Sequence, residues 1–212
     1  EGALLKQYSH CATDLISVCM ETTSPLPQVA AAAFNRLAPN SQQQIAGVLS
    51  PYFEFDYFHL STLDVLVRDA LVKSAERKHT RHPDRIDANE SLANANGNLS
   101  VSLSRAGDFS KALSVGRVSL DIRERLARAK PERFEAYWAM SLSNYANRLS
   151  ENGKTEDALT HGKQALEIYE RLARAKPERF EADWATSLGN YANYLSENGK
   201  TEDALTHGKQ AL

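Results

Sequence analysis

The sequence has few of the residues that mark disulfide, metal or membrane proteins. Its 212 residues include two cysteines, Cys11 and Cys19, whose spacing matches no metal-binding or redox motif. We therefore interpret both cysteines as packing residues. No stretch approaches the roughly 18 uninterrupted apolar residues of a membrane-spanning helix, and the N-terminus lacks the charged, apolar and small-residue parts of a signal peptide. These absences predict a cytoplasmic protein that does not enter membranes.

The sequence also lacks an excess of charge of either sign. The formal net charge is −2, and residues 131–176 contain seven Lys or Arg against seven Asp or Glu. A nucleic-acid-binding surface normally carries a clear basic excess, so this balance argues against that class of partner. With 42% hydrophobic residues, the chain has enough apolar material for a core. The expected partner is therefore a protein or peptide.

Motifs for catalysis and cofactor binding are missing as well. Residues 153–155 read Gly-Lys-Thr, like the end of a phosphate-binding loop, but the glycine required five residues earlier is replaced by Arg148, and by Tyr194 in a second copy of this stretch. His161 and His207 are explained by the same duplication, because no carboxylate or thiol recurs with them at ligand spacing. The chain has no serine elbow and no zinc-protease motif. We therefore predict no enzyme, no cofactor and no metal site.

What the sequence does contain is a long internal repeat. Residues 124–166 and 170–212 are the same 43-residue stretch with four substitutions, and Pro131 recurs as Pro177, 46 residues later. A third, weaker copy lies upstream. Asn98, Leu103 and Gly107 recur 46 residues later, and Leu92 stands at the position of Trp138. Self-similarity at such a period is typical of a solenoid, in which each unit buries its apolar face against its neighbours.

Each repeat is predicted to form two helices joined by a tight turn. Apolar residues at helical spacing occupy residues 138–149 and then 158–172. Between these segments, Gly153 supplies a residue that tolerates the positive φ of a helix C-terminus. Pro131 and Pro177 are placed as first-turn prolines that begin the next helix pair. Each repeat is thus expected to be an antiparallel helical hairpin.

Small and large residues alternate in a way that would let these helices pack closely. The small residues are Ala146, Ala158, Gly162 and Ala165, and the large ones are Trp138, Tyr145, Tyr169 and Leu172. Small residues allow the two helices of a hairpin to approach, and large ones fill the space between neighbouring pairs. A bulky residue at Ala158 is therefore predicted to break the stack.

This pattern resembles the tetratricopeptide repeat. The residues that carry the resemblance are Gly153, Ala158, Ala165 and Pro177. The usual unit has 34 residues, and the longer unit here, with Asn-Tyr-Ala-Asn at 144–147, is similar to the repeats of kinesin light chains and to their counterparts in bacterial STAND-type signalling ATPases. The resemblance covers about residues 62–212. It implies an all-α fold, a right-handed superhelical solenoid of antiparallel helix hairpins, with a concave face that binds proteins.

Residues 1–60 do not show the repeat, and we expect them to form a helical segment that packs on the array. Helices are predicted over residues 4–20, 28–37 and 41–49, with a turn over 22–27. Five aromatic residues follow Pro51, namely Tyr52, Phe53, Phe55, Tyr57 and Phe58. A docking patch is one interpretation of this run, but packing is favoured because the first solenoid unit must have its open face covered.

The array is predicted to occupy residues 61–212. It divides into a partial unit over 61–82 and repeats over about 83–130, 131–176 and 177–212, the last one truncated. We therefore expect a fragment of a longer protein, or an array with further copies after Leu212. An uncapped apolar end would also allow self-association.

The tetratricopeptide resemblance also implies which residues line the concave face. These candidate partner-binding residues are Asn94, Val101, Arg105, Met140, Ser143, Asn147, Glu151, Thr186, Gly189, Asn193 and Glu197. An exposed asparagine offers both a donor and an acceptor, so Asn147 and Asn193 could pair with a peptide backbone. For the second asparagine series, Asn98, Asn144 and Asn190, we favour hydrogen bonding within the helix stack.

The four differences between the twin copies all lie on the first helix of the repeat. They are Tyr137 against Asp183, Met140 against Thr186, Ser143 against Gly189, and Arg148 against Tyr194. Two of these positions, 140 and 143, belong to the candidate concave face. Our hypothesis is that the scaffold was duplicated recently and that its recognition face then began to diverge, with neutral drift as the alternative.

The sequence therefore predicts a protein- or peptide-binding scaffold that recognises a partner on its concave face. The resemblance further implies a role as the sensor or interaction arm of a larger bacterial signalling or defence protein. The alternative function is a structural spacer or self-assembly element without a groove ligand.

Overall fold

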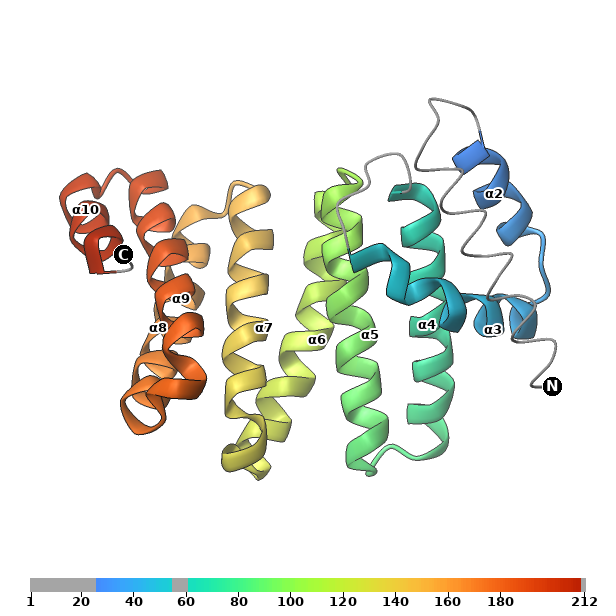
Figure 1. The fold of residues 1–212 in the computed structure, drawn as a ribbon, viewed down its shortest axis with the longest axis horizontal. Helices are drawn as coiled ribbons and strands as arrows, with labels where there is room; N and C mark the ends of the chain where they lie inside the picture. Colours follow the sequence, from blue (N-terminus) through green and yellow to red (C-terminus); the bar gives the residue numbers. More distant parts are fainter. Residues whose placement is uncertain (1–25, 55–60, 211–212) are drawn as a thin grey trace. The chain divides into compact units, whose positions relative to one another are not determined.

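The computed structural model describes residues 26–54 and 61–210, and all the regular elements in these ranges are helices (Figure 1). Their order is α2 (Leu26–Asn35), α3 (Pro39–Leu49), the short 3-10 helix η1 (Ser50–Glu54), α4 (Ser61–Arg81), α5 (Ile86–Arg105), α6 (Phe109–Ala129), α7 (Pro131–Glu151), α8 (Thr155–Ala175), α9 (Pro177–Glu197) and α10 (Thr201–Gln210). The predicted all-α fold of helical hairpins is confirmed.

The chain divides into two compact units, Glu1–Asp108 and Phe109–Leu212. In the first unit, α2 and α3 pack on α4, which also packs on α5. In the second unit, each helix from α6 to α10 packs on the next helix in the chain. The repeat pattern predicts a boundary at residue 60, between the N-terminal segment and the array. This boundary does not coincide with the one between the two compact units, and it stays a prediction.

The turn inside each hairpin follows from one glycine. Gly153 has φ +71°, a conformation open to glycine because it lacks a Cβ. The amide of Lys154 donates to the carbonyl of Leu149 at 2.9 Å, and that of Gly153 donates to Ser150 at 2.8 Å. This is the hydrogen-bond pattern of a Schellman C-cap. Gly107 and Gly199 repeat the positive φ, so the three sequence copies share one turn geometry.

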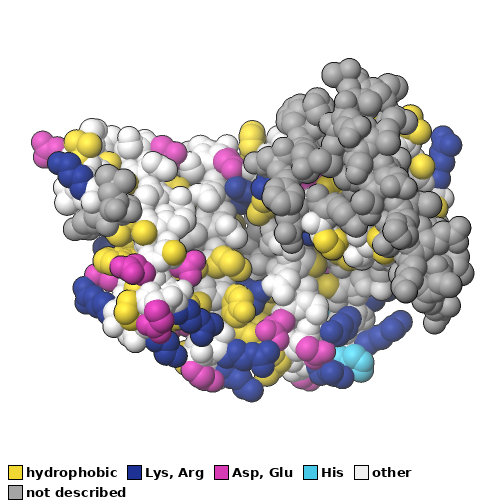
Figure 2. Space-filling model, in the orientation of Figure 1, with side chains coloured by type: hydrophobic (Ala, Val, Ile, Leu, Met, Phe, Trp, Pro, Cys, Tyr) yellow, Lys and Arg dark blue, Asp and Glu magenta, His cyan; other side chains and the backbone are white. Residues whose placement is uncertain are grey.

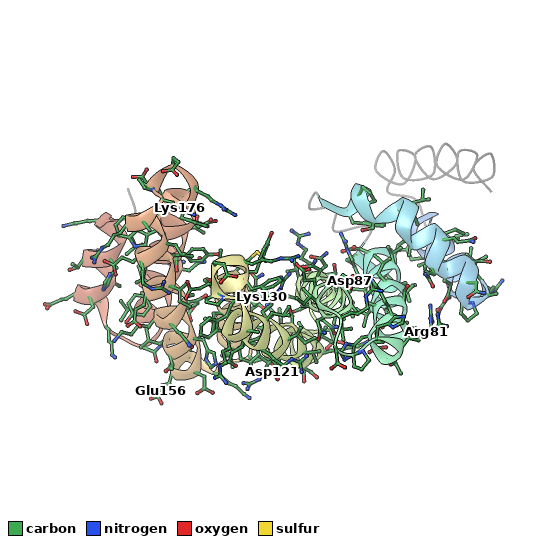
Figure 3. All side chains as sticks on the ribbon, turned by 90° about the horizontal axis from the view of Figure 1, so that it is seen from below. Arg81, Asp87, Asp121, Lys130, Glu156 and Lys176 are labelled. Carbon is green, nitrogen blue, oxygen red and sulfur yellow. The ribbon has the colours of Figure 1, made fainter. Side chains whose placement is uncertain are left out.

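The connection between successive hairpins is a single residue. Lys130 separates α6 from α7 and Lys176 separates α8 from α9; both lysines are labelled in Figure 3. Their backbone angles are nearly identical, with φ −146° and ψ 75° at Lys130 and φ −147° and ψ 73° at Lys176. Pro131 and Pro177 follow in the first turn of the next helix, as predicted, where the missing amide hydrogen costs nothing. The sequence period is thus reproduced in the backbone.

The first unit buries an apolar core between α4 and the shorter helices before it. This core contains Ala31, Phe34, Ala46, Leu49, Phe53, Leu63, Val67 and Ala70. Phe53 is only 3% exposed, so this member of the aromatic run is a packing residue. The other four aromatic side chains of that run, the helix predicted over 4–20 and both cysteines lie outside the described residues.

The second unit has a core of alternating small and large side chains, as the repeat predicts. Ala146, Ala158 and Ala165 are fully buried, and they share one cluster with Leu142, Tyr145 and Tyr169. The small residues let neighbouring helices approach, and the large ones fill the remaining space. No described helix is long and apolar enough to span a bilayer.

Candidate partner-binding surface

The eleven candidate residues lie on the first helix of each hairpin. Asn94, Val101 and Arg105 are on α5 in the first unit; Met140, Ser143, Asn147 and Glu151 are on α7; Thr186, Gly189, Asn193 and Glu197 are on α9. On each helix they are spaced three to seven residues apart, so they form one stripe. All eleven are exposed or half-buried, which leaves them able to meet a partner.

In the second unit, the stripes of α7 and α9 lie side by side. The hydroxyl of Ser150 donates to Glu197 Oε2 at 2.6 Å. The hydroxyl of Tyr194 donates to Asn147 Oδ1 and lies 3.5 Å from the carbonyl oxygen of Ser143. These contacts join the two helices along one surface, which we name the α7/α9 surface and define by the eight candidate residues of α7 and α9.

The two asparagines of this surface are not equivalent. Asn147 is half-buried, and its side-chain oxygen accepts the hydrogen bond from Tyr194. Asn193 is exposed, and its side chain makes no hydrogen bond to any residue that the structure describes. Burial, together with the charge of Glu197, raises the pKa of the Tyr194 hydroxyl, so Tyr194 remains a hydrogen-bond donor at physiological pH. Asn193 therefore offers its full amide to a partner, whereas Asn147 offers mainly its NH₂ group.

A pocket of about 350 Å³ continues the α7/α9 surface toward the first turns of α7 and α9. Tyr137 and Met140 line it from α7, Asp183 lines it from α9, and Tyr169 and Leu172 line it from α8. Tyr137 and Met140 are 45% and 42% exposed, which makes them large apolar groups available for contact. The pocket thus adds an apolar recess to a surface of amides and hydroxyls.

Sequence reasoning missed Tyr137 and Asp183 as site residues. In the sequence these two residues are distinguished only as one of the four differences between the twin copies. The structure places both in the pocket with Met140, which belongs to a second of those differences. A search for the positions that differ between near-identical repeats would therefore have found part of this site.

Charged groups near the pocket are largely engaged with neighbours. Arg171 forms two hydrogen bonds with Glu135, one of them 3.0 Å long, and the guanidinium of Arg123 lies 4.7 Å from the centre of the Tyr137 ring. Burial and the charge of Asp183 raise the pKa of Tyr169, whose hydroxyl lies 3.3 Å from the carbonyl oxygen of Ala136. Figure 2 shows basic and acidic side chains interspersed over the described part of the face in view. This mixed charge suits a peptide better than a polyanion.

In the first unit, Asn94 lines a second pocket of about 340 Å³ between α4 and α5. Ser91 and Asn98 line the same pocket from α5, and Arg68 and Lys78 line it from α4. At the rim of this region, hydrogen bonds from Arg85 and Lys78 lower the pKa of Asp87 to about 2. The predicted residues Val101 and Arg105 lie farther along α5 and do not line this pocket.

The histidines and the Gly-Lys-Thr turn have packing or capping roles. His161 Nδ1 is hydrogen-bonded to the carbonyl of Asp157 at 2.8 Å, and its ring meets the ring of Tyr145 edge to face at 5.2 Å. His207 repeats that ring contact with Tyr191. Within residues 26–54 and 61–210, no group of three His, Cys, Asp or Glu side chains is placed to hold a metal ion.

Comparisons with known proteins agree with this geometry. Residues 138–173, in α7 and α8, match a family model described as tetratricopeptide repeat. A putative kinesin light chain from Podosopora anserina with nearly identical TPR-like repeats has a similar crystal structure, with a TM-score of 0.61 and 17% identity over 100% of this chain and 94% of that one. BtubC (BKLC) from P. vanneervenii is also similar, with a TM-score of 0.52 and 15% identity over 98% of this chain and 89% of that one. No curated protein matches the sequence.

At these identities the solved structures establish the fold, while the family match identifies the repeat. That match covers most of one hairpin, and the next hairpin repeats its sequence almost unchanged. Residues 138–173 therefore match the tetratricopeptide repeat, and they lie within a fold similar to that of kinesin-light-chain-like repeat proteins.

Proposed function

We propose that this chain is a protein-binding scaffold whose α7/α9 surface recognises an extended segment of a protein partner. Folds built from tetratricopeptide-like repeats generally mediate protein–protein interactions, and such scaffolds are generally not catalytic. The observation that carries the proposal is the stripe of exposed and half-buried, mostly polar residues on two adjacent helices, which ends in a pocket lined by Tyr137 and Met140.

The amides and the pocket of the α7/α9 surface would contribute differently to the binding of a peptide. The amides of Asn147 and Asn193 can hydrogen-bond a peptide backbone whatever its side chains, because an amide supplies both donors and an acceptor. The pocket, at about 350 Å³, has room for one large side chain of the partner. Met140 and Tyr137 would contact the apolar part of that side chain. The amides then provide affinity, and the pocket provides selectivity.

The proposal is tested by affinity capture from cell lysate, with mass spectrometry to identify the bound proteins. We expect Asn193→Ala to remove a protein that the wild type captures, because this variant deletes an exposed amide that no described residue uses. The matched control is Asn190→Ala, which changes a half-buried asparagine of the other series on the same helix. Identical sets of proteins on wild type and Asn193→Ala would refute the proposed role of the amides.

A second prediction concerns the positions where the twin repeats differ. Exchanging Met140 with Thr186 and Ser143 with Gly189 is expected to change partner affinity but to shift the melting temperature by less than about 2 °C. All four positions are exposed or half-buried, and a Cβ on Gly189 would have no neighbour within 4 Å.

The control exchanges the fourth differing pair, Arg148 with Tyr194, which are 9% and 3% exposed. This exchange should lower the melting temperature, because both side chains are packed. If the surface exchange lowered the melting temperature and left binding unchanged, the assignment of a recognition face to these positions would be wrong.

As part of this proposal, the scaffold would act as the sensor or interaction arm of a larger bacterial signalling or defence protein. The second candidate function is a spacer or self-assembly element. Light scattering over a range of concentrations distinguishes the two, since oligomers that form without any captured partner would favour self-assembly.

A further inference from the structure

A pocket in the first unit carries hydrogen-bond donors that the proposed function does not use. This α4/α5 pocket, of about 340 Å³, is lined by residues of α4 and α5 and by Ser50, the first residue of η1. Among the described residues that line it, two are cationic, Arg68 and Lys78, and five are serines or asparagines. None of these described residues is acidic. Cationic side chains can only donate hydrogen bonds, so the pocket favours a ligand that supplies acceptors.

Each of the two helices contributes one face to the α4/α5 pocket. The lining residues of α4 lie between positions 68 and 78 at helical spacing, and those of α5 lie between 91 and 98. Leu71 and Ala95 give these faces an apolar part. Ser74 is half-buried and Asn98 is exposed, and neither side chain makes a hydrogen bond to a residue that the structure describes. A hydroxyl and an amide are therefore available beside the cations.

Arg68 is held in a fixed geometry at one end of the α4/α5 pocket. Its Nε donates to Asp64 Oδ1 at 3.1 Å, its Nη1 donates to Ser50 Oγ at 2.9 Å, and its Nη2 donates to the carbonyl of Ser50 at 3.3 Å. The side chain of Arg68 is only 11% exposed. A guanidinium has five N–H groups, so one N–H on each terminal nitrogen has no acceptor among the described residues. These two N–H groups belong to a planar fork, which suits two oxygens of one anion.

Lys78 places a second cation at the other end of the lining residues on α4. Its ammonium group lies 3.1 Å from Asp87 Oδ2 and donates to Ser91 Oγ at 3.4 Å, which accounts for two of its three N–H groups. Asp87, labelled in Figure 3, also accepts from Arg85. Neither Asp64 nor Asp87 lines the pocket. The two carboxylates thus position the cations and leave the pocket itself to a ligand.

We propose that the α4/α5 pocket binds a small molecule through an oxyanion group, either a carboxylate or a phosphate. The oxyanion accepts hydrogen bonds from the two remaining N–H groups of Arg68. The body of the ligand lies against Leu71 and Ala95, where the Ser74 hydroxyl and the Asn98 amide bind its polar groups. The positive charge of Lys78 attracts the anion to the pocket. A volume of about 340 Å³ lies near the lower limit for ligand pockets, so the ligand is compact.

The proposal is tested by isothermal titration calorimetry on the full chain, in a buffer of low ionic strength that contains neither phosphate nor carboxylate. The probes share one three-carbon body: glycerol 3-phosphate, glycerate and glycerol. We expect saturable binding of at least one of the two anions, with one molecule per chain, and no binding of glycerol. Binding of glycerol 3-phosphate alone would identify the group as a phosphate, and binding of glycerate alone would identify it as a carboxylate.

Arg68→Lys keeps the positive charge but removes the planar fork, so it should weaken binding of the anion at least about tenfold. Asn98→Ala should weaken it about threefold without affecting folding, because this exposed side chain holds no described neighbour. The matched control is Lys73→Gln. Lys73 is another lysine of α4, paired with Asp69 at 2.7 Å, and it does not line the pocket. Its substitution should leave the affinity unchanged.

Two results would overturn the proposal. One is the absence of saturable binding by both anions, or equal binding of the anions and glycerol. The other is an equal loss of affinity in Arg68→Lys and Lys73→Gln, because the anion would then respond to the charge of α4 and not to the pocket. Circular dichroism melts verify that the variants are folded. If Arg68→Lys is unfolded, Asn98→Ala decides, and an unchanged affinity in that variant contradicts the assigned site.

Discussion

Replacing Ala158 with tryptophan is expected to lower the free energy of unfolding by about 3 kcal/mol or more. Ala158 is fully buried, and it shares a core cluster with Ala146, Leu149 and Tyr194. These cluster members come from α7 and α9, and α8 packs against both helices. A protein core is close-packed, so an indole ring at this position has no free volume to enter. The helices on both sides of α8 would have to separate.

The matched control is Ala204→Trp. Ala204 lies in the same local sequence one repeat later, but it is half-buried and α9 is the only helix that packs on α10 among the described residues. The tryptophan can therefore turn toward the open side, and we expect a loss of about 1 kcal/mol. Urea unfolding of both variants measures the difference. Equal losses would show that the cost arises inside a single hairpin and not from the stacking of one hairpin on the next.

Much of the second unit could be predicted because its decisive signals are local. Gly153 determines the turn through its own φ, and Pro131 and Pro177 determine where α7 and α9 begin. In the first unit the same reasoning was less accurate. The sequence predicts a turn that includes Pro27 and a helix that starts at Gln28, but Leu26 and Pro27 are already helical, within α2. A proline in the first turn of a helix costs no hydrogen bond, so a proline alone does not distinguish a turn from the start of a helix.

The candidate site was less predictable, since its shape depends on distances between helices. The resemblance to the tetratricopeptide repeat implies that Met140, Asn147 and Asn193 line a surface, and in the structure they are exposed or half-buried. The resemblance could not show that Tyr194 reaches across to Asn147, or that α7, α8 and α9 leave a pocket at one end of the stripe. Those features arise from how far apart the helix axes lie, which the size of several packed side chains determines together. The role of the stripe in binding stays a prediction.

Gly162→Ala is expected to destabilise the protein by about 1–2 kcal/mol, although alanine is the better helix former. In the middle of a helix, replacing glycine with alanine normally contributes up to about 1 kcal/mol of stability. At Gly162, however, the new methyl carbon would lie 2.5 Å from Cδ2 and Cε2 of Tyr194. Tyr194 is 3% exposed and its hydroxyl is hydrogen-bonded to Asn147, so the ring cannot move aside freely. Overpacking of this kind costs about 1–3 kcal/mol, which exceeds the gain in helix propensity.

The twin substitution Gly208→Ala should have the opposite sign. Its Cβ would approach only the Cβ of Ala192, at an ordinary contact distance of 4.0 Å. Helix propensity therefore determines the result, and the free energy of unfolding should rise by up to about 1 kcal/mol.

A double-mutant cycle identifies the cause of the difference between Gly162→Ala and Gly208→Ala. In a Tyr194→Ala background the ring is absent, and Gly162→Ala should then behave like Gly208→Ala, with a coupling energy of about 1–3 kcal/mol between positions 162 and 194. A coupling energy near zero would mean that the ring is not the obstacle.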